Sequence, residues 1–165
     1  MTLLMRQEFV RPFLAPTRLV WKREFGADIT VRDTRIVADR YETSDITVVV
    51  GIGGRLTGNV MYGFGEQTSV QVANRLIGAN TPIDDPMAVS AIGEIANMIT
   101  GNAVARLAAE GFLCEITPPV IMEPRGVPIA ITIPRQVLVV LDSDLGSLAI
   151  RISLSENLCT KRQAA

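Results

Sequence analysis

Residues 86–110 carry the longest helical pattern in the chain, and the apolar side of that helix must be buried against a large surface. Asp85 is a typical N-cap residue, Pro86 suits the first helical position, and Gly111 suits the residue after a helix. The apolar side chains that recur at helical spacing on one side are Ala88, Ile92, Ile95, Ile99, Ala103 and Leu107. This side is the predicted core face of the helix.

Strand patterns lie on both sides of this helix. Residues 45–52 are rich in β-branched side chains, Gly53 and Gly54 suit a turn, and residues 56–64 alternate in polarity, so these segments predict a hairpin. The other strand-like segments are 28–44, which includes a connection, 112–116, 127–133, 136–141 and 147–154. Because neighbouring strands are joined by short turns, we expect an α+β fold with a mostly antiparallel sheet and helices packed on one face.

Two shorter helices are predicted at residues 6–25 and 66–78. The first is followed by Gly26, a natural C-terminal stop. Pro12 and Pro16 cannot both occupy its first position, so the regular helix either begins at Pro16 or kinks there. In the second helix, the apolar positions at helical spacing are Val70, Ala73, Leu76 and Ile77.

The composition restricts the chemistry that the chain can perform. Its 165 residues are 48% apolar, which fits a single domain, 1–165, with a polar tail from about residue 155. Histidine is absent, which excludes Ser-His-Asp and Cys-His nucleophiles and histidine metal sites. The 16 basic and 17 acidic residues give a net charge of -1. We therefore expect no nucleic-acid partner.

The sequence also bears on redox state and location. Cys114 and Cys159 match no metal-binding or redox spacing, so we expect free, reduced thiols. Arg6 and Glu8 interrupt what would be the apolar core of a signal sequence, and no stretch approaches ~18 uncharged apolar residues. We expect a cytoplasmic protein without a membrane partner.

The side of the long helix opposite its core face carries a small polar set. This set consists of Ser90, Glu94, Asn97 and Gly101, spaced by four, three and four residues. Such spacing places them in one sector of roughly 60°. Between Asp85 and Arg106, Glu94 is the only ionisable side chain. Gly93 and Gly101 either leave room for a partner or permit helix or subunit packing beside ordinary surface residues.

Residues 90–102, SAIGEIANMITGN, resemble the signature helix of the CheX/CheC/FliY family of bacterial chemotaxis phosphatases. The resemblance extends to residues 51–58 and 116–119, and it is strongest with the CheX members. It implies a CheC/CheX-like fold and a homodimer that pairs through a sheet or hairpin edge. CheC-like relatives carry two signature helices, whereas residues 8–11 of this chain have Arg11 in place of the asparagine. One site per chain is therefore implied.

The resemblance implies a phosphatase that acts on the aspartyl-phosphate of a CheY-type response regulator. It assigns Asn97 to orienting the attacking water and Glu94 to pairing with a lysine of the regulator. Ser90, Gly93 and Gly101 would contribute to the surface that contacts this partner. An amide suffices for such a task because phosphoryl transfer depends mainly on positioning. We expect no cofactor or metal of the chain's own, and a Mg²⁺ ion in the regulator.

Two alternatives to catalysis stay open. One is a module that binds a receiver domain in a signalling complex without turnover, and the other is a dimeric scaffold that buries the small-residue face of the helix. The amide of Asn97 favours catalysis, because a scaffold has no need for an amide at that position. Burial of Glu94 without a partner would be costly, so an occluded Glu94 would favour the scaffold.

Overall fold

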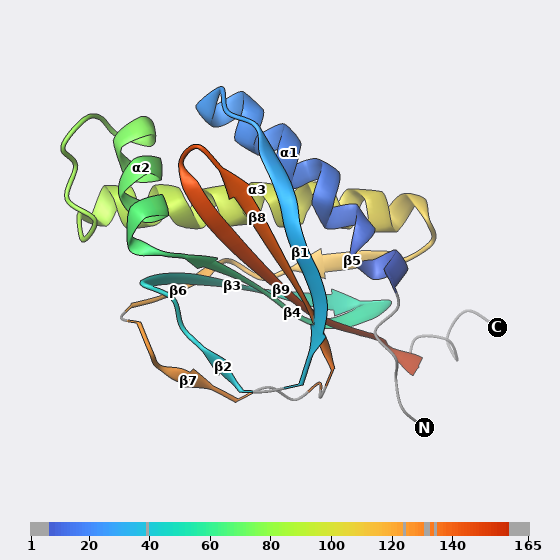
Figure 1. Cartoon of the computed structure of the whole chain (residues 1–165). Helices are drawn as coiled ribbons and strands as arrows, with labels where there is room; N and C mark the ends of the chain where they lie inside the picture. Colours follow the sequence, from blue (N-terminus) through green and yellow to red (C-terminus); the bar gives the residue numbers. More distant parts are fainter. Residues whose placement is uncertain (1–6, 39, 124, 131–132, 134, 159–165) are drawn as a thin grey trace.

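The main element of the fold is a seven-stranded antiparallel sheet (Figure 1). The computed structural model describes residues 7–38, 40–123, 125–130, 133 and 135–158. The strands of the sheet are β1 (Ile29–Val37), β3 (Ile46–Gly54), β4 (Leu56–Phe64), β5 (Cys114–Ile116), β6 (Val120–Met122), β8 (Gln136–Ser143) and β9 (Gly146–Glu156). Their order is β1-β8-β9-β4-β3-β5, and β6 also pairs with β3. Every pairing is antiparallel, as predicted.

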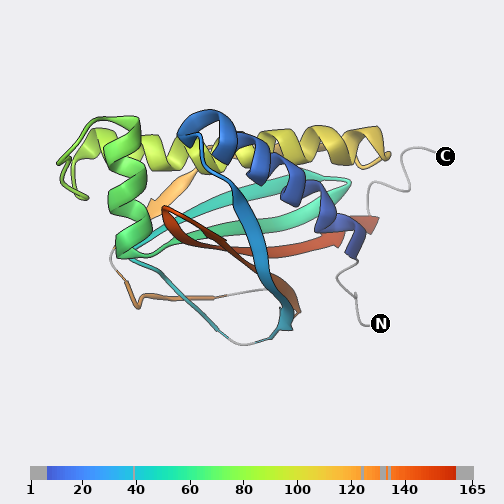
Figure 2. The same cartoon turned by 45° about the horizontal axis from the view of Figure 1, so that its top comes forward.

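Helices cover one face of this sheet (Figures 1 and 2). They are α1 (Arg11–Phe25), which a short 3-10 helix (Gln7–Phe9) precedes, α2 (Glu66–Leu76) and α3 (Pro86–Ala109). A separate two-stranded ribbon, formed by β2 (Tyr41–Glu42) and β7 (Pro128–Ile129), lies on the other side of the sheet (Figure 1). The predicted α+β fold, with helices on one face of an antiparallel sheet, is confirmed.

The long helix α3 forms as its end signals predict. The Asp85 carboxylate accepts hydrogen bonds from the backbone N–H groups of Met87 (2.9 Å) and Ala88 (3.4 Å), which caps the first turn. After the helix, Gly111 adopts a positive φ of 93°. All six residues of the predicted core face are buried. Burial of this face fixes which side of α3 remains exposed.

Helix α1 begins at Arg11 and contains both prolines. Pro12 lies in the first turn, where its missing N–H would have no helical partner, and Pro16 lies inside the helix. The interpretation in which the regular helix begins at Pro16 is therefore wrong. The helix ends at Phe25, and Gly26 adopts the left-handed conformation (φ 63°), as predicted.

The buried face of helix α2 only partly matches the predicted one: Ala73 is buried and Leu76 packs partly buried against the core, as predicted. Apolar spacing indicates Val70, Ala73, Leu76 and Ile77, whereas the buried residues are Thr68, Ser69, Val72 and Ala73. The Thr68 hydroxyl donates a hydrogen bond to the Ser147 carbonyl (2.7 Å), and the Ser69 hydroxyl donates to the Phe64 carbonyl (3.4 Å). Thr68 and Ser69 can be buried because their hydroxyls form hydrogen bonds with backbone carbonyls. A pattern of apolar residues does not detect such positions.

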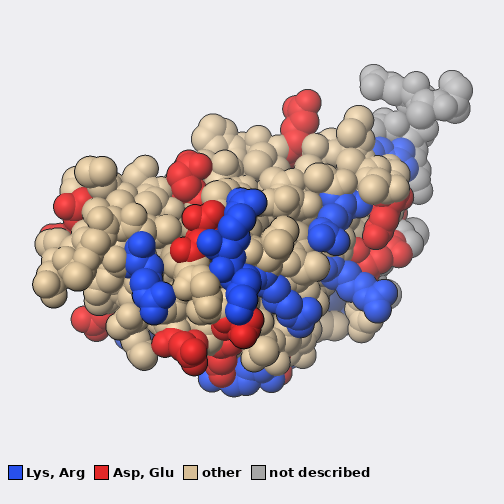
Figure 3. All heavy atoms as spheres, turned by 90° about the horizontal axis from the view of Figure 1, so that it is seen from above, with Lys and Arg blue, Asp and Glu red and all other residues tan. Residues whose placement is uncertain are grey.

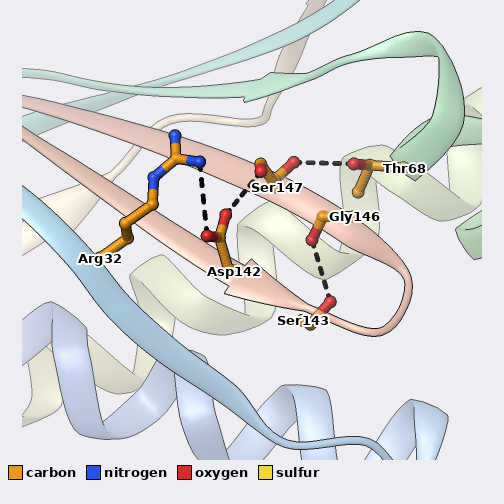
Figure 4. A network of polar contacts seen from close by, with 6 residues as sticks. All are labelled: Arg32, Thr68, Asp142, Ser143, Gly146 and Ser147. Atoms are coloured by element: carbon orange, nitrogen blue, oxygen red, sulfur yellow. Dashed lines mark hydrogen bonds and ion pairs between the residues drawn. The ribbon is translucent and has the colours of Figure 1, made fainter.

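Polar contacts hold α2 against the hairpin of β8 and β9 (Figure 4). The Asp142 carboxylate accepts a hydrogen bond from the Ser147 hydroxyl (2.6 Å) and lies 3.4 Å from the Arg32 guanidinium. The carbonyl of Ser147 in turn accepts the hydrogen bond from the Thr68 hydroxyl. Arg32 and Asp142 are both well exposed, so their ion pair adds little stability. The bond from the Thr68 hydroxyl joins α2 directly to β9.

Some segment boundaries differ from the predicted ones. Strand β9 continues to Glu156, which pairs with Leu56, so residues 155 and 156 are not the frayed tail that was expected. Strand β6 is too short and follows two prolines too closely to be predicted from pattern. The predicted strand 127–133 contains only β7 among its described residues, and residues 131 and 132 lie outside the described part.

Two further expectations concern the thiols and the membrane. Cys114 is a buried, free thiol, as predicted, and Cys159 lies outside the described residues. Within the described ranges, none of the helices has the length and apolar character needed to span a membrane.

Candidate functional site

The polar set of α3 lies on the exposed side of the helix. Ser90 and Glu94 are exposed, and Asn97 and Gly101 are half-buried. At a rise of about 1.5 Å per residue, Glu94 and Asn97 are separated by about 4.5 Å along the helix axis. Residues three apart on a helix are surface neighbours, so a single partner can contact both side chains at once.

Glu94 and Asn97 are available to a partner. Within the described residues, neither side chain forms a hydrogen bond or an ion pair with another group. The part of the chain that the structure describes also holds no group of three or more Asp, Glu or Cys residues placed to bind a metal ion. The chemistry that these residues can offer is therefore one carboxylate and one amide at an open surface.

Gly93 borders the polar set on the side of Asn97. It is buried, and a β-carbon added to it would lie 2.8 Å from Ile121 Cδ1 and 4.0 Å from Pro119 Cγ. The missing side chain makes room for β6 of the same chain. The prediction that Gly93 keeps a partner-facing surface clear is wrong, because sequence spacing could not show that β6 packs there.

The segment around β6 forms the flank of the site beside Asn97. Gly93 and Asn97 are four residues apart, so they lie on one side of α3, and Ile121 packs next to this side. Val120, the neighbour of Ile121, is 59% exposed. Sequence analysis missed this apolar edge, because its only signal is a short run of apolar residues after Pro118 and Pro119.

Charged side chains are unevenly distributed on the helix side of the molecule (Figure 3). The exposed basic residues of α1 are Arg11, Arg18, Lys22 and Arg23. Blue side chains gather where α1 and β1 lie, whereas the band of α3 is mostly uncharged and carries separated acidic side chains (Figure 3). Between Asp85 and Arg106, Glu94 is the only ionisable side chain of α3.

A buried tyrosine lies beneath α3. The Tyr62 hydroxyl from β4 is 2.7 Å from the Thr100 hydroxyl of α3, and both residues are fully buried. Burial raises the pKa of Tyr62 well above its ordinary value of 10.0, and the hydrogen bond with Thr100 offsets only part of this effect. The phenol is therefore neutral at physiological pH and acts only through hydrogen bonds.

Replacing Gly101 with alanine stabilises the isolated protein by about 1 kcal/mol, because alanine has the higher helix propensity. A β-carbon at Gly101 would meet no atom within 4 Å, so nothing in the described structure opposes the change. The midpoint of thermal unfolding measures the gain, and we expect a rise of roughly 2–4 °C.

Gly93→Ala is the matched comparison for this prediction. It makes the same chemical change in the same helix, but its β-carbon would lie 2.8 Å from Ile121 Cδ1, so the Ile121 side chain must shift and the net stabilisation is smaller. Equal stabilisation by both substitutions would contradict the packing of Ile121 against Gly93 and the open space at Gly101.

Comparison with known proteins assigns the chain to a family. The family model for the chemotaxis phosphatase CheX matches residues 46–141. The CheY-P phosphatase CheX of Thermotoga maritima is 33% identical over 85 residues, which cover 51% of this chain and 55% of that protein. This match spans about half the length of the relative.

Solved structures share the fold described above. CheX from Vibrio vulnificus has a TM-score of 0.78 at 25% identity, over 90% of this chain and 99% of that chain. A CheC-like superfamily protein from Shewanella sp. PV-4 has a TM-score of 0.81 at 22% identity, over 92% of this chain and 99% of that chain. A CheX-CheY-BeF3-Mg²⁺ complex from Borrelia burgdorferi has a TM-score of 0.63 at 22% identity, over 92% of this chain and 100% of that chain. With more than half of its residues matched by the family model, and with the fold of the family's solved structures, this chain belongs to the CheX family.

Proposed function

We propose that this protein hydrolyses the aspartyl-phosphate of a CheY-type response regulator. The observation that carries the proposal is the pair of Glu94 and Asn97, neighbours on the exposed side of α3 with no partner among the described residues. Two relatives support it. The Thermotoga maritima protein is named a CheY-P phosphatase, and the Borrelia burgdorferi structure holds CheX together with CheY, BeF3 and Mg²⁺.

Asn97 is the catalytic residue of this proposal. Its amide donates and accepts hydrogen bonds at the same time and needs no proton transfer near neutral pH. It orients a water molecule in line with the bond between phosphorus and the aspartyl oxygen. The water attacks phosphorus, that bond breaks, and the aspartate carboxylate leaves. Such positioning suffices because phosphoryl transfer asks little covalent chemistry of an enzyme.

Glu94 is the docking residue of this proposal. Its exposed carboxylate pairs with a lysine of the regulator and so holds Asn97 over the phosphoryl group. Ser90 and Gly101 lie one turn to either side of the pair, where small residues let the regulator approach α3. Gly93 has no place in this surface, since it packs against Ile121. The Mg²⁺ ion is held by the regulator.

The test of the proposal follows phosphate loss from phosphorylated CheY-type receiver domains. We expect the wild-type protein to accelerate this loss. Glu94→Gln keeps the size of the side chain and removes its charge, so it raises the half-saturating concentration about tenfold, or about 1.4 kcal/mol, with the maximal rate retained. Glu110→Gln is the control, because Glu110 is an exposed carboxylate just after the same helix.

Two outcomes would count against the proposal. If no receiver domain loses phosphate faster with the wild-type protein, the proposed function is wrong. If Glu94→Gln and Glu110→Gln behave alike while the wild type is active, the docking role of Glu94 is wrong.

The second candidate function is a module that binds a receiver domain, or a dimeric scaffold, without turnover. A homodimer is compatible with both functions, and the edge strand β1 supports it, because Ile36 on that strand is 62% exposed. The exposure of Glu94 argues against a scaffold that buries this face of α3. We therefore favour the catalytic function.

A further inference from the structure

A short chain of hydrogen bonds crosses the apolar layer beneath the exposed pair. The Tyr62 hydroxyl is 2.7 Å from the Thr100 hydroxyl, and the Thr100 hydroxyl donates to the Ala96 carbonyl at 2.8 Å. We call this set of groups, the hydroxyls of Tyr62 and Thr100 and the carbonyl of Ala96, the hydroxyl chain. Tyr62 and Thr100 are fully buried and Ala96 is buried as well, so water does not compete for these bonds.

The direction of the hydroxyl chain follows from its proton count. A threonine hydroxyl has one proton, and a carbonyl oxygen only accepts. Because Thr100 gives its proton to Ala96, it must accept the bond from Tyr62. Both bonds therefore point from the sheet toward the helix and end at the peptide group that joins Ala96 to Asn97.

The sheet end of the hydroxyl chain is rigidly placed. Tyr62 belongs to β4, an interior strand that pairs with β3 on one side and β9 on the other. Its direct neighbours across these pairings, Val48 and Ile150, are fully buried. The chain thus fixes the orientation of the Ala96–Asn97 peptide group relative to the middle of the sheet.

Stability alone does not require these hydroxyls. Phenylalanine and valine would fill nearly the same volumes, and replacing both partners of a buried hydrogen bond by apolar groups of similar shape can be nearly neutral. Most side chains around them in the helix–sheet layer are apolar, including the core face of α3. The two hydroxyls instead form hydrogen bonds, which favour one orientation of the groups they join. Packing between apolar surfaces has no such directional preference.

We propose that Tyr62 and Thr100 are positioning residues that hold the backbone of Asn97 in the orientation needed to place its amide over the phosphoryl group. This inference rests on the proposed phosphatase function. Neither residue touches the substrate, since both are fully buried. A shift of about 1 Å in a group that orients a reactant can cost up to 100-fold in rate, so loss of one link in the hydroxyl chain has a measurable effect.

The test separates maximal rate from docking in the dephosphorylation assay. We expect Tyr62→Phe and Thr100→Val each to lower the maximal rate about tenfold, with the half-saturating concentration changed less than twofold. Thr100→Ser retains the hydroxyl and stays close to wild type. The double variant Tyr62→Phe/Thr100→Val is no slower than the slower single variant, because both changes break the same chain.

Thr17→Val is the matched control. The Thr17 hydroxyl is buried and donates to the Phe13 carbonyl at 2.6 Å, the same bond across four residues that Thr100 makes, but it lies in α1. Its loss leaves the maximal rate unchanged. Unfolding curves confirm that each variant is folded under assay conditions, and Thr100→Val carries the test alone if Tyr62→Phe does not fold.

The outcomes distinguish this inference from the proposed function. If the wild type accelerates phosphate loss and both Tyr62→Phe and Thr100→Val keep the full maximal rate, the inference is overturned and the function stands. If Thr17→Val slows turnover as much as Thr100→Val, the effect is general loosening of the fold, and the inference is overturned as well. If the wild type shows no acceleration, the proposed function fails and the inference falls with it.

Discussion

Replacing Asn97 with alanine lowers the maximal rate of regulator dephosphorylation about 100-fold and leaves binding of the regulator nearly unchanged. The expected loss is large because the Asn97 amide can orient a water molecule without carrying charge, and alanine has no group that could do so. Asn97 is half-buried and is hydrogen-bonded to no other described side chain, so its truncation removes few contacts within the protein. Single-turnover decay of the phosphorylated regulator measures the rate.

Asn102→Ala is the matched control for this prediction. Asn102 is an exposed asparagine of the same helix, and its Nδ2 donates to the Met98 carbonyl at 2.8 Å. Five residues beyond Asn97, it lies about 140° around the helix and points away from the site. Its truncation leaves the rate unchanged.

The Asn97→Ala result also decides between catalysis and a binding module. A variant that binds the regulator and no longer accelerates phosphate loss establishes a catalytic amide. A variant as fast as the wild type would show that Asn97 does not orient the water. Loss of binding together with loss of rate would move Asn97 from the catalytic role to the docking surface.

The sequence predicts α3 and its exposed face well because the signals are local. A capping aspartate, a proline at the first position and a glycine after the end define the helix, and the spacing of its apolar residues defines the buried side. Once that side is buried, the position of Glu94 and Asn97 on the exposed side follows from helix geometry alone.

Other parts of the site depend on contacts between distant segments. Helical spacing alone predicts that Gly93 belongs to an open surface, but Ile121 packs against it from a strand with almost no pattern of its own. Tyr62 and Thr100 are 38 residues apart, and each fits an apolar pattern when viewed alone. Their hydrogen bond emerges only when β4 and α3 are packed together, which local periodicity does not describe.

Gly58→Ala is expected to destabilise the fold by about 3–5 kcal/mol, the largest effect on stability among the substitutions considered. Gly58 has a φ of 146°, a conformation that side-chain-bearing residues rarely adopt. A β-carbon there would collide with the backbone carbonyl oxygen of Ser153 and lie 3.2 Å from Ile133 Cδ1. Since a backbone atom cannot rotate away as a side chain can, β4 and β9 must separate locally.

Gly53→Ala is the control, because Gly53 lies on the neighbouring strand β3 and a β-carbon there would meet nothing within 4 Å. We expect it to change the free energy of unfolding by less than about 1 kcal/mol, as measured by urea denaturation. Equal midpoints for Gly58→Ala and Gly53→Ala would contradict the close approach of β4 to β9. Because Tyr62 lies on β4, a Gly58→Ala protein that still folds should also turn over more slowly, which links the packing of this strand to the orientation of Asn97.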